Sequence, residues 1–135
     1  MSGVPETILA ARLLAHSGVA ALTTTIRPVM LAPNDSMPAV VYQRTATEFE
    51  NYSTGADTTA HATVDVTSLE TDYSDAKALA KQVRLALSGW ADGNGDIWHL
   101  QDESDQAVGP ENGEEGPLVY QVVQSYRVSY TLETS

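Results

Sequence analysis

Apolar and polar residues recur along the chain at two spacings, and each spacing predicts one kind of element. Over residues 60–68, Ala62, Val64 and Val66 alternate with polar residues, which is the pattern of a β-strand with one buried face. Over residues 74–88 the apolar positions recur every three or four residues, as on an amphipathic helix. These positions are Ala76, Leu79, Ala80, Val83 and Leu87. The chain is therefore expected to combine helices with strands.

The predicted helix boundaries rest on residues that start or stop helices. Pro5 suits the first turn of a helix, and Gly18 offers a stop for it. Asp72 or Ser74 can cap the second helix, which Gly89 ends. The first helix is apolar over a wide arc, so burial on two sides is expected, one of them against a neighbouring subunit.

Five strands are predicted from β-branched and alternating residues that lie between turn signals. They cover residues 20–26, 39–47, 60–68, 97–101 and 118–132. With the two helices, the element order is α-β-β-β-α-β-β. Short loops between consecutive strands favour antiparallel pairing. The expected fold is α+β, a mainly antiparallel sheet of about five strands with two helices packed on one face.

Length and charge narrow the class of protein. The 135 residues fit a single domain, 1–135. The net charge of −11 argues against a protein that grips nucleic acid or an anionic membrane, because both tasks need clustered Lys and Arg. The absence of cysteine excludes disulfides and thiolate metal sites. Residues 1–15 lack the basic start of a signal peptide, so assembly in a cytoplasm is expected.

The acidic residues are concentrated late in the chain. Residues 92–115 hold eight acids and no base. Residues 102–117 also contain three glycines and two prolines, so they are expected to form a long mobile acidic loop. Residues 48–59 carry Asn, Ser, Gly and Asp and are expected to form the tip of a hairpin.

One stretch partly matches a calcium-binding loop. Asp92, Asn94, Asp96 and Glu103 occupy its positions 1, 3, 5 and 12. The sharp turn of such a loop needs glycine at position 6, where this chain has Ile97. The alternative is a glycine-rich turn that leads from the second helix into a strand, and no metal or other cofactor is predicted.

Nothing in the sequence selects an enzyme. The three histidines, His16, His61 and His99, lie on different predicted elements, where structural roles are more common than catalytic ones. No nucleophile elbow, phosphate-binding loop or dinucleotide fingerprint is present. We therefore expect a protein that is not an enzyme.

Three of the seven basic residues share one face of the second helix. They are Lys77, Lys81 and Arg84, spaced i, i+4 and i+7. The face is either solvated or a subunit interface that meets an acidic surface, such as the acidic loop of another copy. Arg12 interrupts the apolar arc of the first helix and is a further interface candidate.

Several segments together resemble one protein family. A strand ends in Ile26-Arg27-Pro28, and the segments that follow in order are Ala32-Pro33, Pro38-Ala-Val-Val-Tyr42, Ala62-Thr-Val-Asp-Val66, Tyr73-Ser-Asp-Ala-Lys-Ala-Leu-Ala-Lys-Gln-Val-Arg-Leu-Ala-Leu87 and Tyr126-Arg-Val-Ser-Tyr130. In this order and spacing the chain resembles the tail completion, or tail terminator, proteins of long-tailed bacteriophages. The resemblance covers about residues 5–132.

The resemblance implies a structural virion protein at the junction of tail and head. Such subunits form a ring, here expected to contain six copies, that caps the tail tube, ends its growth and joins the head connector. DNA passes through the ring without specific binding, and acidic groups that face the channel would repel it. The candidate contacts with tube or connector are Glu50, Tyr52, Asp102, Glu103 and Asp105. Alternatives are another head–tail connector or minor tail protein, or a calcium- or small-ligand-binding domain.

Overall fold

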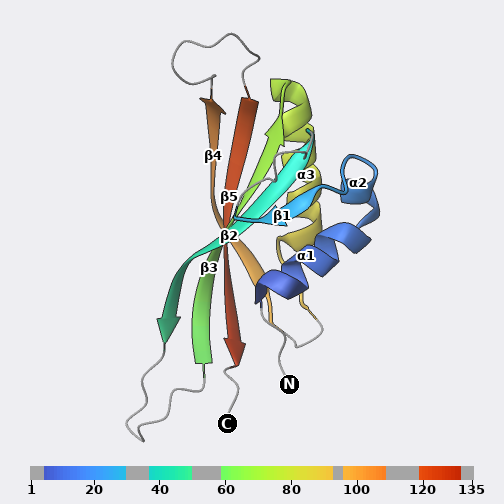
Figure 1. The fold of residues 1–135 in the computed structure, drawn as a ribbon. Coiled ribbons are helices and arrows are strands. Elements are labelled where there is room, and N and C mark those ends of the chain that lie inside the picture. The colour runs from blue at the N-terminus through green and yellow to red at the C-terminus, as the bar shows by residue number, and fades with distance from the viewer. Residues whose placement is uncertain (1–4, 30–36, 50–58, 93–95, 109–118, 132–135) are drawn as a thin grey trace, which may run out of the picture.

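The computed structural model describes residues 5–29, 37–49, 59–92, 96–108 and 119–131. Its elements are α1 (Pro5–Ala15), α2 (Ser17–Ala20), β1 (Ile26–Pro28), β2 (Ala39–Phe49), β3 (Thr59–Glu70), α3 (Tyr73–Leu87), β4 (Trp98–Val108) and β5 (Val119–Thr131). Figure 1 shows the helices together on one side of the sheet. No helix within these ranges is long and apolar enough to span a bilayer.

The five strands form one sheet in the order β1-β2-β3-β5-β4. The pairs β2–β3, β3–β5 and β5–β4 are antiparallel. The strands of β2–β3 and β4–β5 are consecutive in the chain, whereas α3 and β4 lie between β3 and β5. β1 instead runs parallel to β2, with Ile26 opposite Val40, so the sheet is mixed. The prediction of an α+β fold with helices on one face of a mainly antiparallel sheet is confirmed.

The apolar face of the sheet packs directly against α3. Ala62, Val64 and Val66 are fully buried and alternate with half-buried residues along β3. The apolar positions predicted on the second helix are all buried as well, with exposed fractions of 1% or less. Asp72 caps this helix by accepting a hydrogen bond from the amide of Asp75 at 3.3 Å. After the helix ends, Gly89 has a φ of +74°, which glycine adopts without steric cost.

The strand predicted over residues 20–26 is wrong except at its end. α2 extends to Ala20, and Thr23 then turns the chain: its hydroxyl donates to the Pro38 carbonyl at 2.6 Å and accepts from the Thr25 amide at 3.0 Å. Such local hydrogen bonds of a Thr side chain compete with strand pairing. Gly18 is not a helix stop but lies within α2, where a Cβ would come within 2.0 Å of Gln82 Oε1.

The loop predicted over residues 102–117 is also wrong in its first part. β4 continues through Val108 and pairs with β5 along its whole length, with a register shift between Leu100 and Asp102. β4 is an edge strand of the described sheet, and charged residues are common on such strands because they discourage pairing with other chains. Residues 109–117 of the predicted loop lie outside the described residues.

Candidate functional site

The acidic part of β4 lies against the basic face of α3 in the same chain. Lys77 Nζ lies 3.2 Å from Glu103 Oε2 and 3.3 Å from Asp105 Oδ1. The hydroxyl of Tyr73, one turn before Lys77, donates to Asp105 Oδ2. We call these four residues the α3–β4 cluster. Lys77 thus pairs with acidic residues of its own subunit, whereas its predicted role as a contact with another subunit stays a prediction.

Gln124 of β5 lies beneath this cluster and is fully buried. Its Nε2 donates to Glu103 Oε1 at 2.8 Å and to the Ala80 carbonyl at 3.1 Å, while its Oε1 accepts from the Tyr126 hydroxyl at 3.2 Å. Gln124 therefore has a partner for each of its polar side-chain atoms. Burial raises the pKa of Tyr126, so its hydroxyl stays a donor.

The carboxylates of the α3–β4 cluster are held in their charged forms. The pKa of Glu103 lies below its ordinary value because Gln124 donates to it; burial opposes this shift and Lys77 adds to it. The pKa of Asp105 is lowered first by the hydrogen bond from Tyr73, again against burial and with help from Lys77. The cluster therefore stabilises the contact between α3 and β4 while both acids are ionised.

We predict that this stabilisation is lost in acid. Because the folded pKa values are lowered, it is fully present above the ordinary values of 4.5 for Glu103 and 3.8 for Asp105, and it disappears as the pH falls below them. Lys77→Met should lower the free energy of unfolding by up to about 1 kcal/mol at pH 7, since the pair is partly exposed, and by less near pH 3. Urea unfolding at both pH values measures the difference. Lys81→Met, on the same helix, is the control and should show neither effect.

Two arginines also link elements of the same chain. Arg12 of α1 donates from Nε to the Ala86 carbonyl at 2.9 Å, and its guanidinium lies 5.0 Å from the ring centroid of Trp90. Arg44 of β2 donates to Glu6 of α1 and, at 2.8 Å, to the Tyr130 hydroxyl of β5. The observed contacts of Arg12, predicted as an interface residue, are thus within its own subunit.

Lys81 and Arg84 are the other members of the basic face, and both are exposed. Within the described ranges, no hydrogen bond or ion pair ends on either side chain. They therefore differ from Lys77 and remain the part of this face that is open to another molecule.

The calcium candidates are not brought together. Asp92 is buried and shapes the turn: its Oδ1 accepts from the Asp96 amide at 3.1 Å, and its Oδ2 accepts from the Trp98 indole at 3.3 Å. Burial, followed by the charge of Asp92, raises the pKa of Asp96. Glu103 lies farther along β4 in the α3–β4 cluster. Asn94 lies outside the described residues, and within them no group of three His, Asp or Glu side chains could hold a metal ion.

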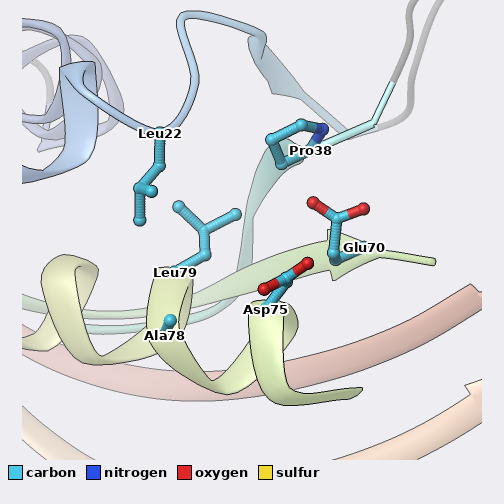
Figure 2. Close-up of a pocket in the computed structure, with 6 residues that line it drawn as sticks. All are labelled: Leu22, Pro38, Glu70, Asp75, Ala78 and Leu79. Atoms are coloured by element: carbon cyan, nitrogen blue, oxygen red, sulfur yellow. The ribbon is translucent and has the colours of Figure 1, made fainter. Parts of the chain in front are cut away.

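A pocket opens on the flank of α3 that faces away from the α3–β4 cluster. Its lining residues are Leu22, Pro38, Glu70, Asp75, Ala78 and Leu79, and its volume is about 220 Å³. Figure 2 shows the carboxylates of Glu70 and Asp75 at one side of the pocket and the apolar side chains of Leu22 and Leu79 at the other. We call this the acidic pocket.

Comparison with known proteins identifies the family of this chain. The model of the family described as Tail completion protein gp17 matches residues 7–131, from α1 to β5. The chain belongs to this family. It is therefore a structural component of a phage tail, as the resemblance predicted.

A solved structure shows a similar fold. A chain in the virion of a native gene transfer agent particle superimposes with a TM-score of 0.69, at 17% sequence identity and over 96% of both chains. At this identity the likeness shows a shared fold. Comparison with curated proteins gave no match.

The chain also has a polar sheet face, on the side away from the helices. Cross-strand partners tie this face together: Ser125 donates to Asp65 at 2.6 Å, and Arg127 donates to Glu48 at 3.1 Å. Among the predicted contact residues, Asp102 is exposed on β4, whereas Glu50 and Tyr52 lie outside the described residues.

Sequence reasoning missed the acidic pocket and the contacts of Arg44. Glu70 and Asp75 flank the turn between β3 and α3, but Leu22 and Pro38 reach them only through the tertiary fold. Arg44 had a detectable signal, since it is a charged residue at an inward position of a strand, where it needs a partner.

Proposed function

We propose that the protein assembles into a ring that caps the phage tail tube, ends tube growth and provides the surface that joins the head connector. The observation that carries this proposal is the match of the tail completion family to nearly the whole folded chain. The fold shared with a chain of a phage-like virion supports it. We expect six copies and no catalytic activity.

The charge of the chain fits this role. Six copies at −11 each would carry −66. If acidic groups face the channel, they repel the phosphate backbone and keep DNA moving, because binding to phosphates requires Lys and Arg. An electrostatic map of the assembled ring tests this, and a neutral or basic channel would rule it out.

We predict that the protein shortens growing tubes. Tail-tube subunits of the same phage are polymerised with and without an equimolar amount of this protein and imaged by negative stain. The expected result is shorter tubes with a ring at one tip, because a capped tip no longer adds subunits. Tubes of unchanged length with bare tips would contradict the proposal. A ring bound to the isolated connector but never to tube tips would identify another connector protein instead.

A further inference from the structure

The basic residues of this acidic chain are almost all occupied within the subunit. Lys77, Arg12, Arg44 and Arg127 have the partners given above, and Arg27 also has an interaction in its own chain. Of the seven basic side chains, all of which lie in the described ranges, this leaves Lys81 and Arg84. Subunits that each carry −11 repel one another, so their contacts need local charge complementarity. These two cations are the side chains available to provide it.

The acidic pocket has the chemistry to receive such a cation. Its volume of about 220 Å³ far exceeds the ~10–15 Å³ that one water requires, so the head of a long side chain fits. Leu22 offers apolar surface to the methylene stem, and Glu70 and Asp75 offer carboxylates to the charged head. Glu70 Oε1 accepts from the amide and hydroxyl of Thr71. Within the described part of the chain no donor reaches its second oxygen, which is left for a partner.

The pocket and Arg84 lie on different flanks of α3. Lys77 marks the flank toward β4, and Arg84 lies close to it in the helical repeat, at i+7. Asp75 and Ala78 mark the flank toward Leu22 and Pro38, which adjoin β1 and β2. Arg84 of a subunit therefore does not share a side with its own pocket. Complementary patches on different sides of one molecule are what a head-to-tail ring requires.

Exposed apolar side chains accompany both patches. Leu22, in the pocket wall, is 42% exposed, and Leu85, next to Arg84, is 54% exposed. A contact between these patches would cover both leucines, and interfaces commonly combine such apolar contacts with charged pairs.

We propose that Arg84 of one subunit binds the acidic pocket, between Glu70 and Asp75, of the next subunit in the ring, with Lys81 beside it. The contact rests on the proposed ring and names the surfaces that close it. Arginine suits this role because its planar guanidinium can bind two carboxylate oxygens and loses its hydration more readily than lysine.

The test uses the tube-capping experiment with reversed charges. Asp75→Lys and Arg84→Glu should each reduce capping. At least about tenfold more protein should then be needed for half of the tips to carry a ring. An equal mixture of the two variants should restore capping. In an alternating ring, the lysine introduced at position 75 faces the glutamate introduced at position 84 at every second contact, and native pairs form at the rest. Ser74→Lys, in the same helical turn but outside the pocket, is the control and should cap normally.

Each other outcome decides against a specific claim. If wild-type protein forms no ring, both the proposed function and this contact fail. If wild type caps tubes and either reversal also caps normally, or if the mixture of folded variants stays inactive, only the contact is overturned. Thermal unfolding checks that the variants fold. Should a reversal unfold, Asp75→Asn and Arg84→Gln replace it; a loss of capping supports the contact, and unchanged capping overturns it.

Discussion

Trp98→Ala is expected to lower the free energy of unfolding by about 3–5 kcal/mol, the usual cost of removing a large aromatic side chain from a core. Trp98 is the largest fully buried side chain, and it packs in the main core. Its backbone also joins the strand to the end of α3, because its amide donates to the Trp90 carbonyl at 3.0 Å and its carbonyl accepts from Gly89 at 2.7 Å. The free energy of unfolding of a native protein is only about 5–15 kcal/mol, so this substitution would remove a large part of it.

Urea unfolding followed by far-ultraviolet circular dichroism measures this loss. Ile97→Ala is the matched control, since Ile97 precedes Trp98 in the chain but is 45% exposed, and it should cost less than about 1 kcal/mol. Trp98→Phe should fall between the two, because it retains a ring but leaves Asp92 Oδ2 without the indole donor. Equal losses for Trp98→Ala and Ile97→Ala would show that the core does not depend on this side chain.

The sequence predicted best those elements whose period is set by burial against one surface. β3 and α3 have regular patterns because every second residue of the strand, and one stripe of the helix, contacts the same core. Asp72 and Gly89 mark the ends of α3 through a local hydrogen bond and a backbone conformation, which sequence reasoning can recognise.

The errors occur where a tertiary contact overrides a local preference. Residues 102–108 contain three acids, a composition typical of a loop. In the fold, however, Lys77 of α3 pairs with two of these acids, and β5 supplies the hydrogen bonds of a strand. Thr23 and Thr25 are β-branched and favour strands. The Thr23 hydroxyl, however, donates to the Pro38 carbonyl and accepts from the Thr25 amide, and these bonds stabilise a turn. Neither Lys77 nor Pro38 is close in sequence to the residues it contacts.

The sequence predicted the candidate assembly surface only in part, again because partners that are distant in sequence decide the outcome. The helical repeat alone groups Lys77, Lys81 and Arg84, and it cannot show which of them has a partner within the subunit. The structure divides the group, because only Lys77 reaches the acids of β4. The division matters for assembly: a cation already paired in its own subunit contributes less to a neighbour than one that is still solvated.

Gln124→Glu is expected to destabilise the protein by about 3 kcal/mol at pH 7, although it changes the side chain by a single group. Gln124 Nε2 donates to Glu103 and to the Ala80 carbonyl, and a carboxylate can donate to neither. The variant would place two carboxylates and a carbonyl oxygen together where residue 124 is fully buried. One of the two acids must then bind a proton, and the pair titrates as a unit with a raised pKa.

The pH dependence of this loss distinguishes charge repulsion from poor packing. A raised folded pKa gives no penalty below the ordinary glutamate value of about 4.3, and a penalty that grows as the pH rises above it. Unfolding measured from pH 4 to pH 8 should therefore show Gln124→Glu close to wild type in acid and increasingly weaker toward neutral pH. Gln124→Met has a similar length but no charge, so its deficit should change much less with pH. A constant deficit for Gln124→Glu would mean that the two carboxylates do not share the buried site, because their repulsion alone depends on ionisation.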